Sequence, residues 1–254
     1  MRRVISIAMN TFRETLREKI LYNLLFFALL MIGSSLLFAR ITYGEFERLI
    51  LDIGLGSINL FGVIIAMFVG IGLVNKEIDK KTIYTILSKP VPRYEFLLGK
   101  YLGLCLTLLV NTGIMVVGLL LVLQTMQVSI DSLLFKSLLL IYIELIVVTA
   151  VALLFSTFTS ATLSAIFTLA VFIIGHLSAD LKVMGQKLGA TGETLLNMIY
   201  YLMPNLERFN LKGHVIHRLD VGFADMMLIV AYGVAYTAVL LLLASIIFQR
   251  RDFQ

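Results

Sequence analysis

The sequence predicts an all-α integral membrane protein with six transmembrane helices, and three observations lead to that fold class. The chain has 254 residues, of which 59% are hydrophobic and only 15% are charged. That apolar share is far larger than a soluble domain of this size needs. The lysines and arginines flank the apolar runs instead of gathering on one soluble face, so the net positive charge indicates membrane orientation and not nucleic acid binding.

Residues 1–19 are expected to form an amphipathic helix that lies in the membrane interface. The segment is too poor in apolar residues to cross a bilayer, but it carries an apolar stripe beside a charged face. The stripe consists of Ile5, Ala8, Met9, Phe12 and Leu16. A polar tail that only sets the topology is the alternative. We favour the helix because the stripe keeps its period for four turns.

Six nearly uncharged segments follow, each close to the roughly 20 residues that a helix needs to cross a bilayer. They are residues 20–39, 53–74, 101–123, 137–157, 160–179 and 226–248. No charge separates the fourth from the fifth, so we place a turn at the Ser-Thr-Phe-Thr-Ser stretch of residues 156–160. We therefore expect a single transmembrane domain over residues 1–254, with five spans in residues 20–179, an external loop at 180–225 and the last span and tail at 226–254.

The positions of the cations predict that both termini and residues 75–100 are cytoplasmic. Thirteen of the 21 lysines and arginines fall on that side: Arg2, Arg3, Arg13, Arg17, Lys19, Lys76, Lys80, Lys81, Lys89, Arg93, Lys100, Arg250 and Arg251. Most of the others lie in the long external loop, which contributes little to orientation.

Two patterns predict helix packing. In the external loop, apolar residues at helical spacing before Pro204 predict a helix that packs onto the outer ends of the spans or dips into the membrane, and an external amphipathic cap is the open alternative. These residues are Leu195, Leu196, Met198, Ile199, Leu202 and Met203. Small residues four apart predict close neighbours for the second and third spans, either another span or a second copy. They are Gly62, Ala66 and Gly70, and Gly99, Gly103 and Thr107.

Glu144 is the only ionisable carboxylate within a predicted span. It lies seven residues from the start of residues 137–157, which places it roughly 10 Å below the outer edge of the membrane. A charge there is costly, so Glu144 is a candidate for a polar translocation path, and a protonated or water-reached glutamate is the equal alternative. Asn59 and Asn111 are weaker candidates for the same path.

The sequence holds no catalytic motif and no metal motif. We find no glycine-rich loop ending in Gly-Lys-Ser/Thr, no His-Glu-x-x-His and no Cys-x-x-Cys, so we expect neither ATP hydrolysis nor a cofactor in this chain itself. His214 and His217 have the spacing of two ligands for one metal. Without a third ligand we interpret them as surface histidines and predict no metal site.

Residues 75–100 hold the densest group of cations in the chain, between two predicted spans. Ile78, Thr82, Ile86 and Leu87 give the segment helix periodicity, and Pro90 and Pro92 stop it. A stiff amphipathic element in this place could be moved by a partner in the water. A basic loop that exists only for topology would explain the cations but not the two prolines.

The same residues resemble the cytoplasmic signature of the type-2 ABC transporter permease family. The resemblance rests on Lys81-Thr82, on Ile86-Leu87-Ser88-Lys89-Pro90-Val91-Pro92-Arg93, on Glu95, on Gly99-Lys100, on Leu202-Met203-Pro204-Asn205 and on the run from Ile247 to Phe253. It covers the whole chain, and it is closest to the branch that includes the permease of the nitrous-oxide-reductase maturation exporter.

The resemblance implies a permease in the cell (inner or cytoplasmic) membrane that pairs with a second permease copy and is driven by a separate ABC ATP-binding subunit, which would hold the ATP and magnesium. It implies that residues 75–100 are a coupling helix, and it carries contacts to the ATPase over to Glu77, Thr82, Leu87, Ser88, Pro90, Arg93 and Glu95. Arg13 and Arg17 of the N-terminal helix would contact the same subunit.

We therefore expect a permease subunit and not an enzyme, and export is expected only because the family resemblance implies it. An ion-gradient-driven secondary transporter is the first alternative, but all three prolines lie outside the predicted spans and no repeat is visible. A membrane assembly scaffold is the second alternative. An intramembrane enzyme is disfavoured, because His, Asp and Glu do not cluster within the spans.

Overall fold

The computed structural model describes residues 2–41, 45–79, 92–178, 180–181, 184, 189–217 and 219–250. The helices are α1 (Arg2–Leu16), α2 (Lys19–Ile41), α3 (Phe46–Asp79), α5 (Arg93–Thr125), α6 (Ser132–Ser156), α7 (Ala161–His176), α9 (Gly189–Leu202), the 3-10 helix η1 (Leu206–Phe209), α10 (Lys212–His217) and α11 (Phe223–Arg250). None of the described residues is in a strand, so the predicted all-helical class is confirmed for this part of the chain.

Five of these helices, α2, α3, α5, α6 and α11, are long and apolar enough to cross a membrane. The fifth predicted span differs from the prediction, because α7 has only 16 residues. At 1.5 Å per residue it is about 24 Å long, which is shorter than the roughly 30 Å hydrocarbon core of a bilayer. The described helices thus support a multi-pass membrane protein with five candidate spans, and six spans stay a prediction.

The turn between α6 and α7 is where the sequence predicted it. The helix α6 ends at Ser156 and α7 begins at Ala161. The backbone N–H of Thr157 donates to the carbonyls of Leu153 and Leu154, and the hydroxyls of Thr159 and Ser164 lie 2.6 Å apart across the turn. Hydroxyl side chains thus form hydrogen bonds at this turn, as the Ser and Thr residues of the sequence predicted.

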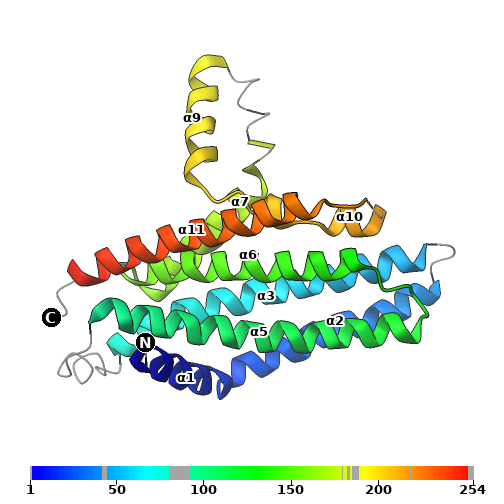
Figure 1. The fold of residues 1–254 in the computed structure, drawn as a ribbon, viewed down its shortest axis with the longest axis horizontal. Coiled ribbons are helices and arrows are strands. Elements are labelled where there is room, and N and C mark those ends of the chain that lie inside the picture. The colour runs from blue at the N-terminus through cyan, green and yellow to red at the C-terminus, as the bar shows by residue number, and fades with distance from the viewer. Residues whose placement is uncertain are drawn as a thin grey trace.

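The long helices run side by side along one bundle axis, and one end of the bundle gathers several chain segments (Figure 1). Both termini lie at this end, together with the last turn of α3 and the first turn of α5. The helices α3 and α5 reach beyond their predicted spans, so residues 75–79 and 93–100 continue these two helices and form no separate helix. The rest of the predicted coupling segment, residues 80–91, lies outside the described residues.

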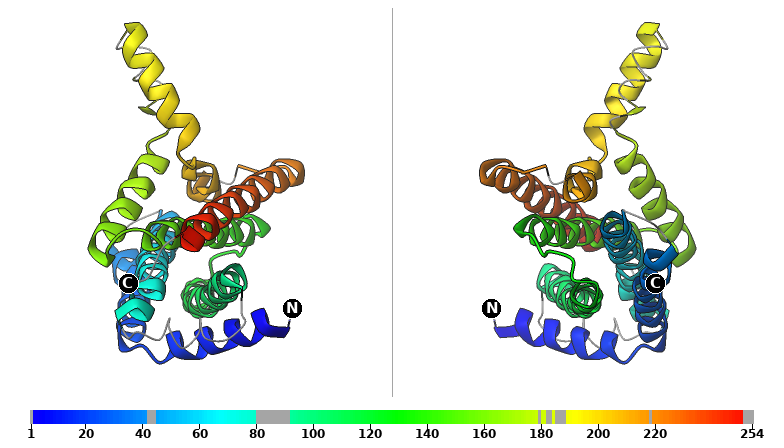
Figure 2. Two further views of the ribbon diagram at one scale, coloured as in Figure 1. Left: turned by 90° about the vertical axis from the view of Figure 1, so that its left-hand side faces the viewer. Right: turned by 90° about the vertical axis from the view of Figure 1, so that its right-hand side faces the viewer.

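The helix α1 lies across the start of α5, on the opposite side of the bundle from α9 (Figure 2). Two glycines of α5 make this contact possible: a Cβ on Gly103 would lie 2.5 Å from the carbonyl oxygen of Ala8, and one on Gly99 would lie 2.8 Å from Cβ of Ile7. Ile5 and Met9 stay exposed, at 60% and 42%. These exposed residues suit the predicted position in the membrane interface.

The other small-residue stripe faces α6. A Cβ on Gly62 would lie 2.7 Å from Cδ1 of Leu145, and one on Gly70 would lie 2.8 Å from Cβ of Ala152. The tight neighbour of the second span is α6, another span, as the sequence predicted. That of the third span is α1, the N-terminal helix, which is neither of the two neighbours that the sequence predicted. Neither stripe needs a second copy of the protein to explain it.

The segment that was predicted to be external contains the predicted helix, α9 (Gly189–Leu202), which ends two residues before Pro204. It projects away from the bundle in all the views, and Met198, Tyr201 and Leu202 are 68%, 77% and 64% exposed (Figure 1, Figure 2). The helix therefore does not pack back onto the spans of its own chain. After α9, the residues of η1 return to the bundle, where Leu206 and Phe209 are buried.

Candidate functional site

Glu144 is the middle residue of α6, with twelve helical residues on either side of it. This position is deeper than the sequence predicted, because α6 begins at Ser132 and not at Ser137. At 1.5 Å per residue, Glu144 lies about 18 Å from each end of the helix. Its side chain is fully buried. A carboxylate at this depth is stable only with polar partners.

Each carboxylate oxygen of Glu144 has a partner on another helix. The side-chain amide of Asn59 on α3 donates to Oε2 at 2.8 Å. Nε2 of His176, the last residue of α7, lies 2.8 Å from Oε1. The predicted pair of path residues, Asn59 and Glu144, is thus in direct contact, 85 residues apart in the sequence.

The hydrogen bonds continue from His176 to the surface. Nδ1 of His176 lies 3.1 Å from Oε2 of Glu207 in η1, and the amide of Asn210 donates to the other oxygen of Glu207 at 3.0 Å. We call the connected side chains of Asn59, Glu144, His176, Glu207 and Asn210 the polar relay. It joins α3, α6, α7 and the η1 segment.

Local packing holds His176 beside Glu207. A Cβ on Gly175 would lie 2.7 Å from the carbonyl oxygen of Pro204 and 2.8 Å from Cγ of Leu206, so only glycine allows α7 to end directly against this backbone. Phe172 packs edge-on against the imidazole, with ring centroids 4.7 Å apart. Tyr232 of α11 accepts the backbone N–H of Asn205 at 2.9 Å and so ties the segment before η1 to the bundle.

The third path candidate, Asn111, is not part of the relay. It is buried in α5, where its amide donates to the carbonyl of Thr107 one turn earlier, at 2.8 Å. This hydrogen bond stays within one helix and does not connect Asn111 to Glu144.

At the other polar region of the molecule, the start of α5 is tied to the end of α11. Nη1 of Arg93 donates to the carbonyls of Phe248 and Gln249, each at 3.1 Å. The rings of Phe96 and Phe248 stack beside it, with centroids 6.4 Å apart. Helix C-termini leave carbonyls without partners inside the helix, and a cation there is favourable. Arg93, predicted as an ATPase contact, thus also has a role within the chain.

The remaining predicted coupling residues are less fully placed. Glu77 lies in the last turn of α3. Oε2 of Glu95 is buried without a hydrogen-bond partner among the described residues. Thr82, Leu87, Ser88 and Pro90 lie outside the described residues. Arg13 and Arg17 are exposed near the end of α1, at the end of the bundle where both termini lie.

The predicted pair of loop histidines falls on α10, and His217 lies at its last position with a side chain outside the described part. Among the described residues, no group of three His, Cys, Asp or Glu side chains is placed to hold a metal ion.

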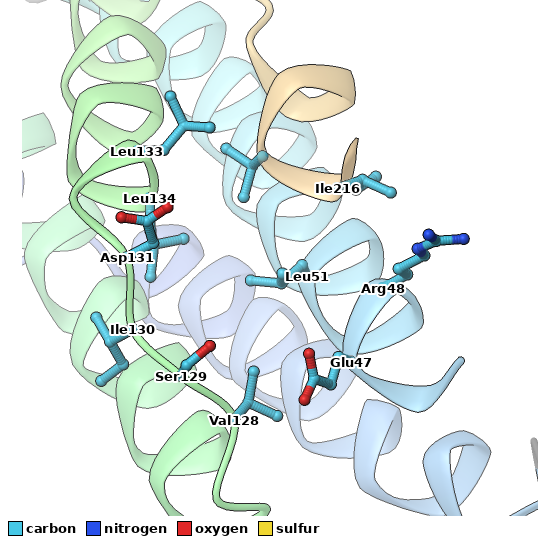
Figure 3. Close-up of a pocket in the computed structure, with 11 residues that line it drawn as sticks. Glu47, Arg48, Leu51, Val128, Ser129, Ile130, Asp131, Leu133, Leu134 and Ile216 are labelled. Atoms are coloured by element: carbon cyan, nitrogen blue, oxygen red, sulfur yellow. The ribbon is translucent and has the colours of Figure 1, made fainter. Parts of the chain in front are cut away.

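A separate pocket of about 550 Å³ lies at the opposite end of the bundle from the termini. It is formed by the start of α3, the connection between α5 and α6, the start of α6, and α10, with Glu47, Leu51, Ser129 and Ile130 among its lining residues (Figure 3). Its other charges have local partners: Arg48 pairs with Glu45 at 2.8 Å, and Asp131 accepts the backbone N–H of Ser132 at the start of α6. The pocket is distinct from the relay.

Sequence reasoning did not single out His176 or Glu207. They lie 32 and 63 residues from Glu144 along the chain, so no short sequence pattern connects them to it. One signal was present: His176 is a single titratable residue within the apolar run of residues 160–179, and such a residue needs a polar partner.

The chain matches the family model of the ABC-2 family transporter proteins over residues 5–253. Among curated proteins, no relative matches it significantly. The family match covers the relay, the tie between Arg93 and α11, and every helix described above except the first three residues of α1.

Proposed function

This chain belongs to the ABC-2 family of transporter proteins, and from that premise we propose that it is the permease half of an ATP-driven exporter, moved by a separate ATP-binding subunit. Membership makes it a membrane permease component of an ABC transporter and implies an ATP-binding partner and a lipid environment. To this we add a docking site for the ATP-binding subunit, a route by which its movement could be transmitted to the helices, and export as the direction of transport.

The observation that carries the proposal is the gathering of segments at one end of the bundle. The helix α1, the last turn of α3, the first turn of α5 and the end of α11 all lie there (Figure 1). The described segments at this end carry Arg2, Arg3, Arg13, Lys76, Arg93 and Arg250, and cations of this kind favour the cytoplasmic side. We propose that the ATP-binding subunit docks here, on residues 75–100, on Arg13 of α1 and on Arg17 just after it.

Movement would pass from the docking region into the bundle through packed helices. A push on residues 80–91 acts directly on α3 and α5, because these two helices flank the segment. The bonds from Arg93 to the carbonyls of Phe248 and Gln249 would carry the same movement to α11. Contiguous packing of this kind is a physical route for coupling between distant sites.

Five further details of the proposal are supported only by the resemblance of the sequence to the permease family. They are the pairing of two permease copies around a central path, a location in the cytoplasmic membrane, export as the direction, ATP and magnesium on the partner, and a place in the branch of the nitrous-oxide-reductase maturation exporter. The cargo is not part of the proposal.

The test is to purify the full chain from its native membranes in mild detergent and to assay ATP hydrolysis in the purified complex. We expect an ATP-binding subunit to copurify and to hydrolyse ATP. Glu77→Lys, and separately the double change Arg13→Glu with Arg17→Glu, should reduce the recovered ATPase, because both reverse charge at the proposed docking end. Arg93→Glu is unsuitable, since it would also break the tie to α11.

Arg48→Glu is the matched control, because Arg48 is an arginine at the opposite end of the bundle with only a local ion pair. It should leave the recovered ATPase unchanged. Equal loss of ATPase with Arg48→Glu, or recovery of no ATP-binding subunit with the native chain, would overturn the docking proposal.

A further inference from the structure

The relay places one imidazole between two carboxylates. Nε2 of His176 lies 2.8 Å from Glu144 and Nδ1 lies 3.1 Å from Glu207. A carboxylate that has lost its proton can only accept, and each ring nitrogen is either a donor or an acceptor. Both contacts are hydrogen bonds only when one proton lies in each of them. The geometry therefore requires two protons shared among three titratable groups.

The exposure of the three groups rises along the relay. The side chain of Glu144 is fully buried, that of His176 is 22% exposed, and that of Glu207 is 43% exposed. The imidazole is thus the only one of the three that touches both the buried carboxylate and the exposed one. It offers a continuous route for a proton from the surface to the centre of α6.

The depth of the relay also indicates what surrounds its exposed end. Glu144 is the middle residue of α6, and Glu207 is only one imidazole ring away from it. A half-exposed carboxylate at the depth of the hydrocarbon core is not stable against lipid, and such groups face water-filled cavities or protein instead. The side of the bundle formed by the end of α7 and by η1 therefore faces water or protein.

Among the residues that the structure describes, His176 is the basic side chain in contact with Glu144 and Glu207. The other charged or titratable side chains described on α3, α6, η1 and α11 are Glu47, Arg48, Asp52, Lys136, Tyr142, Arg208, Asp225, Tyr232 and Tyr236. Arg48 pairs with Glu45, Lys136 pairs with Asp220, and the guanidinium of Arg208 lies 5.2 Å from the ring centroid of Tyr232. Within the described residues, no lysine or arginine forms an ion pair with Glu144 or Glu207.

We propose that Glu144, His176 and Glu207 form a proton-exchange relay, through which the buried carboxylate of Glu144 takes up and releases a proton from the water that reaches Glu207. The proposal goes beyond the permease function and does not require an ATP-binding partner. Its ligand is the proton itself, and it gives Glu144 a way to change charge in the middle of the membrane.

The exchange is balanced and needs no other reactant. Glu207 takes a proton from water, and its O–H bond breaks as the proton moves to Nδ1 of His176. The N–H bond at Nε2 then breaks as that proton moves to Oε1 of Glu144. Glu207 ends as a carboxylate and Glu144 as a neutral acid, while the imidazole carries its proton on Nδ1. The reverse shifts return the proton to water.

The test follows deuterium exchange at the Glu144 carboxyl by time-resolved infrared spectroscopy, with the full chain in lipid nanodiscs. The band is assigned as the protonated-acid signal that is missing from Glu144→Gln. In the native chain we expect this band to respond to external pH and to shift quickly in heavy water. In His176→Gln the shift should slow by on the order of tenfold or more, because an amide can keep the hydrogen bonds but cannot pass a proton.

Two further variants separate a relay from a static hydrogen-bond network. Glu207→Gln should also slow the exchange, since it removes the group that collects the proton, whereas His214→Gln on α10 should not. A static network predicts the opposite for His176→Gln, namely an unchanged exchange rate. That result, or the lack of any protonated-acid band attributable to Glu144 over the pH range in which the protein stays folded, would overturn the proposal.

A second measurement guards against variants that fold poorly. The chain contains three histidines, so nitrogen NMR of labelled histidine can follow His176 directly, with its signal assigned through His176→Gln. Glu144→Gln and Glu207→Gln should each move the titration midpoint of His176 to lower pH, by about tenfold or more in proton affinity, because each removes a negative partner. If the titration midpoint of His176 were the same in the native chain, in Glu144→Gln and in Glu207→Gln, that result would also contradict the relay.

Discussion

Two polar connections hold this bundle together, and they are built from opposite kinds of chemistry. At the end near the termini, Arg93 of α5 donates to the backbone carbonyls of Phe248 and Gln249. In the middle, His176 of α7 joins the carboxylates of Glu144 and Glu207. The first connection is a fixed cation on backbone acceptors, and the second is a set of three titratable side chains.

Because their chemistry differs, we expect the tie at α11 and the polar relay to have different roles. A guanidinium keeps its charge at every physiological pH and a carbonyl does not titrate, so the tie at α11 behaves as a permanent joint. The relay changes its hydrogen bonds whenever it gains or loses a proton. In the functions proposed above, the first connection transmits force and the second changes its polarity. The predictions below test this division, starting from the largest effect.

The largest effect is expected for Glu144→Ala. This change leaves the amide of Asn59 and the imidazole of His176 without their buried acceptor, and removal of one partner from a buried polar pair typically costs about 3–5 kcal/mol. Glu144→Gln retains an acceptor oxygen and should cost much less. The free energy of unfolding, measured by denaturant titration in mixed micelles, distinguishes them. Equal losses in both variants would mean that the hydrogen bonds of the carboxylate are not what stabilises the site.

The next effect is expected for Gly175→Ala, which tests the packing that brings the relay together. The added Cβ would meet the carbonyl oxygen of Pro204 at 2.7 Å, and backbone cannot move aside cheaply. We expect a loss of about 1–3 kcal/mol, as for other overpacked sites, and slower deuterium exchange at Glu144.

Gly113→Ala is the matched control for this change. Gly113 lies inside α5, and a Cβ added there would meet no atom within 4 Å, so alanine should stabilise the helix by about 0.5–1 kcal/mol. Thermal unfolding of both variants measures the contrast. A neutral Gly175→Ala would show that the segment before η1 can shift without harm.

A third effect is expected for Arg93→Ala, which removes hydrogen bonds from a charged donor. Such bonds contribute about 1.5–3 kcal/mol, and those of Arg93 are partly exposed, so we expect the lower part of that range. The loss should vary less with pH than that of any variant of the relay, because the two carbonyl acceptors do not titrate. Arg93→Lys should recover part of it, because a lysine still places a cation at the end of α11. A loss in Arg93→Ala that varies with pH as strongly as that of a relay variant would remove the distinction between the two connections.

Most of the fold could be predicted from the sequence, because it depends on local signals. Apolar run length located the long helices, and the hydroxyl residues at 156–160 located the turn after α6. The start of α6 was predicted less well, because the charge of Lys136 marked the expected edge of the span, whereas the helix begins at Ser132. For the site, the sequence identified Glu144 and Asn59 as polar groups in apolar surroundings. It could not identify Glu207 or its link through His176, because these contacts join separate elements across many residues.

The smallest effect is expected where α6 meets the connection before α11. Lys136 donates from Nζ to Asp220 at 3.1 Å and to the carbonyl of Val221 at 2.9 Å, and this lysine holds the pKa of the exposed Asp220 carboxyl below its usual 3.8. A lowered pKa means that the pair stabilises the fold at neutral pH and loses its effect as the pH falls through the lowered value. Asp220→Asn should therefore lower the melting temperature slightly at neutral pH, and added salt or acid should abolish the difference. Lys136→Met, which also leaves the carbonyl of Val221 without its donor, should lower it more. A difference for Asp220→Asn that persists in acid and in high salt would contradict an ionic origin.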